Sequence, residues 1–202
     1  AAKVLGSQPL PRGNKLGILT NAGGPGILSA DRAEAEGLTV PQLSRPLQGD
    51  LRRSLLPTAS AANPVDMIAG ASARHYEAAL KTLLASEEVD QVLVMFIPPV
   101  VTRTADVVQA ILNARKAVDV PKPLVAAMMV EQGSGEGDLD RLESGGIPVF
   151  RFPEDAVVAL AQLTRYRNWR KEPKGTIRRF SGVKRDEAKA IIAHVQDWAQ
   201  AE

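Results

Sequence analysis

Short apolar runs alternate with longer stretches of helical period between residues 13 and 166. The apolar runs are rich in Val, Ile and Leu, and they predict five β-strands, at residues 15–20, 38–40, 89–97, 124–130 and 148–152. The third run is almost continuously apolar, as expected for a central strand that is covered on both faces. This alternation indicates strands joined through helices into a parallel sheet.

The stretches between the strands predict six helices, at residues 25–36, 44–56, 73–85, 104–118, 137–144 and 154–169. Each is bounded by Pro, Gly or a small polar residue. Because crossovers of this length are nearly always right-handed, we expect an α/β fold of the flavodoxin-like type. Its five-stranded parallel sheet would be doubly wound, with helices on both faces, and a C-terminal helical extension would follow at residues 185–201.

The composition of the chain excludes several classes of functional site. The chain has 202 residues and no Cys, which excludes disulfides, thiolate nucleophiles and cysteine-based metal centres. Its two histidines, His75 and His194, are far apart in the sequence, so we predict no metal site. The longest apolar run, 92–101, contains two prolines and is shorter than the roughly 20 residues of a membrane helix. We predict a cytoplasmic protein without a membrane segment.

The net charge of +2 is unevenly distributed along the chain. Residues 165–189 hold ten basic and three acidic side chains, whereas the remainder holds fifteen basic and twenty acidic ones. We therefore expect a compact domain at 14–172, an interdomain linker at 1–13, and a basic linker and helix at 173–202. No interleaving of basic and aromatic residues accompanies the basic segment, so we predict no nucleic-acid partner.

The loop after the first predicted strand has the composition of an anion site. It consists of Thr20, Asn21, Ala22, Gly23, Gly24, Pro25 and Gly26. Ligands of open parallel sheets bind beyond the carboxyl ends of the strands, and the free amides of a helix N-terminus favour a phosphate. The loop lacks the Lys of a P-loop, and no acidic residue closes the second strand as in dinucleotide-binding folds. A tight turn without a ligand is the alternative.

A second loop follows the stretch 44–56 and consists of Asn63, Pro64, Val65 and Asp66. Pro64 restricts Asn63 to extended geometry, and Asp66 could accept amide hydrogen bonds or meet a cation. An Asx-type turn is an equally open interpretation. We predict His75 and His194 to be surface residues, and no Ser-His-Asp arrangement can be argued.

Several motifs taken together resemble one domain of the NDP-forming acyl-CoA synthetases. They are residues 13–26, Asp31, residues 63–66, residues 146–150 and the pair Pro153 and Glu154. That family includes ADP-forming acetyl-CoA synthetase, and similar modules occur in bacterial protein lysine acetyltransferases. The resemblance covers essentially the whole chain and is to the second flavodoxin-like ligase domain, equivalent to the C-terminal domain of the succinyl-CoA synthetase β subunit.

The resemblance implies a reaction in which acyl-CoA, phosphate and ADP interconvert with acid, CoA and ATP through a phosphorylated histidine. The histidine would lie in a preceding domain, beyond a CoA-binding domain, and an ATP-grasp domain would follow the chain. CoA, ATP or ADP, phosphate and Mg²⁺ would serve the parent protein, with no cofactor bound tightly by this chain. The chain would contribute no catalytic residue, be inactive alone, and possess a site that stabilises the phosphohistidine. The resemblance places Asn21, Ala22, Gly23, Gly24, Pro25, Gly26, Asn63, Val65 and Asp66 at that site.

Two alternatives stay open. One is a free-standing flavodoxin-like module for FMN or another phosphorylated small molecule, although aromatic residues are only 4% of the chain and leave little to stack on a flavin. The other is the equivalent domain of a protein lysine acetyltransferase. The sequence does not distinguish ADP from GDP, identify the acyl substrate or set the oligomeric state, and an oligomer is compatible with it.

Overall fold

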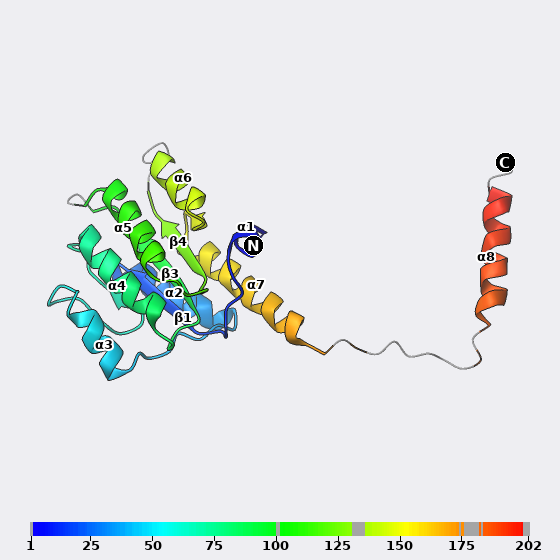
Figure 1. Cartoon of the computed structure of the whole chain (residues 1–202), viewed down its shortest axis with the longest axis horizontal. Coiled ribbons are helices and arrows are strands. Elements are labelled where there is room, and N and C mark those ends of the chain that lie inside the picture. The colour runs from blue at the N-terminus through cyan, green and yellow to red at the C-terminus, as the bar shows by residue number, and fades with distance from the viewer. Residues whose placement is uncertain are drawn as a thin grey trace. The chain divides into compact units, whose positions relative to one another are not determined.

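The computed structural model describes residues 2–99, 102–130, 136–173, 175, 182 and 184–199. The chain divides into two compact units, Ala1–Lys171 and Glu172–Glu202. The second unit contains one helix, α8 (Arg185–Ala199), in its described part (Figure 1). The predicted C-terminal helical extension is therefore present. Most of the predicted basic linker, residues 174, 176–181 and 183, lies outside the described residues.

Five parallel strands form one sheet in the order β2-β1-β3-β4-β5. They are β1 (Leu16–Thr20), β2 (Val65–Asp66), β3 (Gln91–Phe96), β4 (Leu124–Met128) and β5 (Val149–Phe150). Every residue of β1, β3 and β4 is buried, which explains why these strands read as continuous apolar runs rather than as alternating patterns. The predicted α/β fold with a doubly wound five-stranded parallel sheet is confirmed.

Helices cover both faces of the sheet, as predicted. Side chains of β3 alternate between two apolar clusters: Leu93 and Met95 belong to one, Val94 and Phe96 to the other. The first cluster is completed by α1 (Ala2–Ser7), α2 (Gly23–Ala35) and α7 (Pro153–Lys171). The second is completed by α3 (Arg45–Arg52), α4 (Ala73–Ala85), α5 (Thr104–Ala117) and α6 (Glu136–Ser144). Figure 1 shows α4 and α5 side by side on that second face.

The edge strand differs from the prediction. Residues 38–40 were expected to form it, but only Thr39 pairs there, through a single bridge to Lys15, the residue before β1. The chain leaves the sheet at Pro41, which has no N–H to donate to the ladder. β2 forms the rest of this edge, where Val65 pairs with Leu19 and Asp66 with Thr20 of β1. The predicted loop at 63–66 therefore contains the short edge strand.

Residues 2–13, predicted as an interdomain linker, are packed against the domain. Val4 of α1 is fully buried in the cluster that α2 and α7 complete. The side chain of Gln8 donates from Nε2 to the carbonyl of Gly146 at 2.6 Å and accepts from the amide of Leu124 at 2.8 Å. This segment therefore closes the β4–β5 side of the sheet, and its role as a connection to a preceding domain stays a prediction. No helix among the described residues has the length and apolar character needed to cross a membrane.

Candidate functional site

The first turn of α2 lies directly after β1, at the carboxyl edge of the sheet. The hydroxyl of Thr20 accepts from the amide of Ala22 at 3.0 Å and donates to the carbonyl of Ala22 at 2.9 Å, which fixes the turn. Gly23 and Gly24 are the first two helical residues, so their amides have no intrahelical acceptor. Within the described part of the chain, no other acceptor bonds them. Two free N–H groups thus stand at the positive end of the helix dipole.

Three neighbouring residues make this turn possible. A Cβ on Gly26 would lie 3.1 Å from a methyl carbon of Thr20 and 3.4 Å from Pro64, so glycine allows α2 to pack closely on β1. A Cβ on Gly24 would meet nothing within 4 Å, which leaves open space beside its free amide. Pro25 was expected to be the first helical residue, but α2 begins at Gly23 and Pro25 is its third. Its missing N–H removes no helical hydrogen bond at that position either.

Asn21 does not face the space beside Gly24. Its side chain is 3% exposed, donates from Nδ2 to the carbonyl of Ile97 at 2.8 Å, and accepts from the amide of Ile97 at 3.0 Å. It therefore joins the ends of β1 and β3, and its amide group is already satisfied by the backbone.

Asn63 also serves the sheet. Its Oδ1 accepts from the amide of Ile18 at 2.9 Å, and its Nδ2 donates to the carbonyls of Leu16 at 2.8 Å and Pro41 at 3.1 Å. The side chain thus occupies the gap on the edge of β1 between Thr39 and β2. The peptide bond from Asn63 to Pro64 is cis.

Asp66 lies next to the first turn of α2. Its Oδ1 accepts from the amide of Ile68 at 2.9 Å, which is the Asx-type turn that was one of the two interpretations of this loop. Its Oδ2 would be 3.0 Å from a Cβ on Gly23. A carboxylate thus stands beside the two free amides, and two loops 40 residues apart in sequence meet at one edge of the sheet.

The nine residues predicted at this site separate into two groups. Five surround the free amides at the first turn of α2, a place that we call the mouth of the site: Ala22, Gly23, Gly24, Pro25 and Asp66. The other four support the sheet or the packing of α2 upon it: Asn21, Gly26, Asn63 and Val65. Of the histidines, His75 is half-buried at the start of α4 and His194 is exposed on α8.

Three exposed apolar side chains, which the sequence analysis did not single out and which we call the apolar rim, lie at the carboxyl edge of the sheet. Ile27 and Leu28 directly follow Gly26 on α2 and are 62% and 56% exposed. Phe152, which precedes α7, is 59% exposed. Because α2 and α7 pack together and both begin at the carboxyl edge, the three side chains belong to the same end of the domain. The sequence signal was the pair of adjacent apolar residues, because the buried face of α2 consists of Gly26, Ser29 and Ala33 and includes neither of them.

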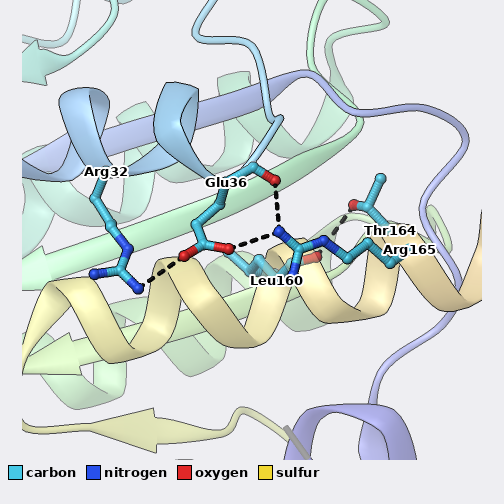
Figure 2. A network of polar contacts seen from close by, with 5 residues as sticks. All are labelled: Arg32, Glu36, Leu160, Thr164 and Arg165. Carbon is cyan, nitrogen blue, oxygen red and sulfur yellow. Dashed lines mark hydrogen bonds and ion pairs between the residues drawn. The ribbon is translucent and has the colours of Figure 1, made fainter.

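The other end of α2 is fastened to α7 by ion pairs (Figure 2). Arg32 donates to one carboxylate oxygen of Glu36 at 2.7 Å, and Arg165 of α7 donates to the other at 2.7 Å and to the Glu36 carbonyl at 3.2 Å. The hydrogen bond from Arg165, with a smaller contribution from Arg32, lowers the pKa of Glu36. These bonds help to hold the helix whose N-terminus faces the mouth.

No group of three or more Asp, Glu or His side chains that could hold a metal ion occurs among the described residues. The chemistry of the mouth is that of hydrogen-bond donors at a helix end, with one carboxylate nearby.

Comparison with known proteins identifies the fold family. The model of the Ligase-CoA domain matches residues 16–174. The chain belongs to this family. It is 38% identical over 159 residues to the ADP-forming acetate–CoA ligase II subunit alpha of Pyrococcus furiosus. The aligned region covers 78% of this chain and 35% of that protein. The chain is 28% identical over 197 residues to the ADP-forming 4-hydroxybutyrate–CoA ligase of Nitrosopumilus maritimus, with 96% and 27% covered.

A solved structure has the same fold. The dinucleotide-forming acetyl-coenzyme A synthetase 1 of Ca. Korarchaeum cryptofilum, in complex with phosphate and ADP, superposes with a TM-score of 0.77 at 28% identity. The superposition covers 83% of this chain and 36% of that one. The Ligase-CoA chain therefore spans about a third of the length of the relatives that it resembles.

Proposed function

We propose that this Ligase-CoA domain is part of an ADP-forming acyl-CoA ligase and holds the phosphoryl group of a histidine presented by a neighbouring domain. The observation that carries the proposal is the pair of free amides at Gly23 and Gly24, at the positive end of α2, beside open space. The names of the two curated relatives described above, both ADP-forming CoA ligases of greater length, support the reaction class.

The domain would act by electrostatics alone. Phosphoryl transfer spreads negative charge over the phosphoryl oxygens, and amides fixed in a helix stabilise that charge without reorganising. Thr20 holds the turn and Asn21 holds the strand ends, so both donors are preorganised. The carboxylate of Asp66 beside the turn would weaken phosphate binding, which suits a site that must also release the group.

Other parts of the parent would supply the remaining functions. We assign Mg²⁺ to another domain, because the described residues hold no acidic cluster for a metal, and we assign the acyl substrate to other domains as well. The apolar rim of Ile27, Leu28 and Phe152 would dock the domain that carries the histidine. The C-terminal segment with α8 would lead into an ATP-grasp domain, and we place the assembled enzyme in the cytoplasm.

Titration of the chain with inorganic phosphate, followed through its amide NMR resonances, tests the site. We expect the Gly23 and Gly24 resonances to move with a saturable dependence on phosphate, and chloride at equal ionic strength to leave them in place. Gly24→Asp would put a carboxylate at the helix end and weaken phosphate binding roughly tenfold or more, while a first-turn acid keeps the helix stable. Gly24→Ala is the matched control: it places the same Cβ before Pro25 as Gly24→Asp does, adds no charge, meets nothing within 4 Å beyond its chain neighbours, and keeps both amides.

Asp66→Asn completes the design. The asparagine keeps an oxygen for the amide of Ile68 and removes the negative charge beside the turn, so phosphate should bind a few-fold more tightly. Phosphate that leaves the Gly23 and Gly24 amides unmoved, or binds Gly24→Asp as well as the unaltered chain, contradicts the proposal.

A further inference from the structure

A separate hollow lies between the C-terminal end of α3 and the N-terminal end of α4. Its volume is about 480 Å³, which is large enough for a small molecule of the size of a nucleotide. Its lining residues are Arg53, Ser54, Leu55, Ser72, Arg74, His75 and Ala78. Two guanidinium groups, an imidazole and two hydroxyls therefore line it, with no carboxylate in the lining, and Leu55 and Ala78 add a small apolar surface.

The positive charge of Arg74 at the start of α4 opposes the helix dipole. The first turn of α4 has no acidic residue and holds Arg74, although a helix N-terminus favours negative charge. His75, by contrast, accepts a hydrogen bond from the amide of Ser72 in a capping box and so supports this helix end. Arg74 is exposed and makes no hydrogen bond or ion pair with the described residues. A bound anion would turn this unfavourable arrangement into a favourable one, since the helix end and the guanidinium would both attract it.

The tautomer of His75 is fixed by its own helix. The backbone N–H of Ser72 donates to Nδ1 of His75 at 2.9 Å, and the hydroxyl of Ser72 lies 3.0 Å from the same nitrogen. A backbone N–H can only donate, so Nδ1 carries no proton and the neutral ring has its hydrogen on Nε2. At its other nitrogen the imidazole of this lining residue therefore carries a donor rather than an acceptor.

Arg53 can join the same ligand. It now pairs with Asp50, three residues before it on α3, and both side chains are mostly exposed. An exposed pair of this kind contributes little stability, so a phosphate in the hollow would compete for the guanidinium easily. Arg53, Arg74 and His75 would then surround one anion from two helices.

We propose that the hollow between α3 and α4 binds the diphosphate group of a small molecule, with Arg74 and His75 as principal donors and Arg53 as an additional one. The site is independent of the turn at Gly23 and Gly24, because it uses different residues of a different helix. A nucleoside diphosphate and the diphosphate of CoA share the recognised chemistry, and the apolar patch would receive the organic part.

Calorimetric and NMR titrations of the full chain with pyrophosphate, ADP and CoA test the site. The expected result is saturable binding with shifts centred on Ser72, Arg74 and His75. Arg74→Gln should weaken the affinity roughly tenfold or more, because a charge-assisted hydrogen bond is lost. Arg103→Gln is the matched control: Arg103 is an exposed arginine at the start of α5, outside the hollow, and its loss should leave the affinity unchanged.

A second variant separates recognition from folding. His75→Asn keeps an oxygen acceptor for the amide of Ser72 and removes the Nε2 donor, so the helix start is retained while binding weakens. Tighter binding of ADP or of CoA than of pyrophosphate identifies the source of the diphosphate. Equal losses in Arg74→Gln and Arg103→Gln, or shifts confined to Gly23 and Gly24, overturn the hollow as a site, and the latter result leaves the phosphohistidine proposal standing.

Discussion

Side-chain amides replace backbone groups at both edges of β1. Asn21 makes two hydrogen bonds with Ile97, and Asn63 makes three with Ile18, Leu16 and Pro41. A primary amide carries the same donor and acceptor types as a peptide group, so it can continue a ladder where the chain has left the sheet. Several backbone groups therefore depend on a single side chain.

Asn63→Ala should be strongly destabilising. It leaves the amide of Ile18 and two carbonyls without their partner, and a buried group that loses its partner costs about 1–3 kcal/mol. We expect the free energy of unfolding to fall by about 2–4 kcal/mol in urea denaturation. Asn168→Ala, at an exposed position of α7, is the control and should change it by less than about 0.5 kcal/mol. Similar small losses in both variants would show that Asn63 does not sustain the sheet edge.

These asparagines also mark the limit of prediction from sequence at this scale. The free amides of Gly23 and Gly24 were predictable, because every helix leaves its first N–H groups unpaired. Whether the amide of Asn21 or Asn63 turns to a ligand or to the backbone was not, because both partners use the same donors and acceptors. Only the positions of Ile97, Leu16 and Ile18 in space decide it.

Lys122 is a buried cation on the opposite edge of the sheet. It is 6% exposed, and its Nζ donates to the carbonyls of Leu83, at 3.1 Å, and Ser86, at the end of α4. Burial lowers the pKa of Lys122 from 10.5 to about 8, while Asp90 opposes the shift and Arg12 adds to it. The two carbonyls and the negative end of the α4 dipole retain the charged form at neutral pH.

This burial predicts a rise in stability at alkaline pH. Between pH 8 and pH 10.5 the unfolded chain holds more protons at Lys122 than the folded chain, so the free energy of unfolding increases with pH by up to about 3 kcal/mol. Lys122→Met removes this pH-dependent contribution. The loss of the Lys122 hydrogen bonds lowers the free energy of unfolding by the same amount at every pH. Urea denaturation of both proteins from pH 7 to pH 10.5 provides the difference. A difference that stays constant over this range contradicts the lowered pKa.

At the scale of elements, the long buried strands were predicted and the short pieces were not. β3 and β4 have enough consecutive apolar residues to be recognised alone. β2 has two residues and depends on Asn63 and on Thr39 to complete its edge, so no local pattern announces it. α1 was missed for a similar reason, because six residues with one buried side chain, Val4, are too few for a helical period.

α2 begins at the mouth of the site and packs against α7. The ion pairs at its C-terminal end should contribute to thermal stability at low salt. Glu36→Gln removes the charge that Arg32 and Arg165 share, so we expect a lower melting temperature at low ionic strength and a smaller difference from the unaltered chain at high salt. The pKa of Glu36 is lowered, so its contribution is present above pH 4.5 and is lost as the pH falls through its folded value. Asp50→Asn, which breaks a more exposed pair, is the control. Equal effects of both substitutions would contradict a special role for Glu36.

At the scale of the whole molecule, alternation of strands and helices was sufficient to predict the doubly wound sheet, because right-handed crossovers leave few topologies. The residues that would face further domains around the site are harder to predict from the sequence. The chain spans about a third of its relatives' length, and residues that would meet further domains are exposed here and lie outside the buried face of their helix. We propose Ile27 and Leu28 as such residues, because burial within this domain gives them no role.

The apolar rim gives the last prediction, which rests on the proposed docking of the histidine-bearing domain. Replacing both Ile27 and Leu28 with Glu should weaken association of the chain with that domain at least tenfold, because two large apolar side chains would be lost from the contact and two charges would be buried. Calorimetric titration of one domain into the other measures it. Folding should be unaffected, since both positions are more than half exposed.

The control for the rim is Ala35→Glu, at the exposed far end of the same helix. It adds one negative charge to α2 without touching the carboxyl edge of the sheet, so association should keep its strength. The double variant should also keep its phosphate-induced shifts at Gly23 and Gly24, because the free amides are unchanged. Lost association with retained phosphate binding would separate docking from anion recognition. Undiminished association would instead place the contact on another face of the domain and leave the exposure of Ile27 and Leu28 without a role.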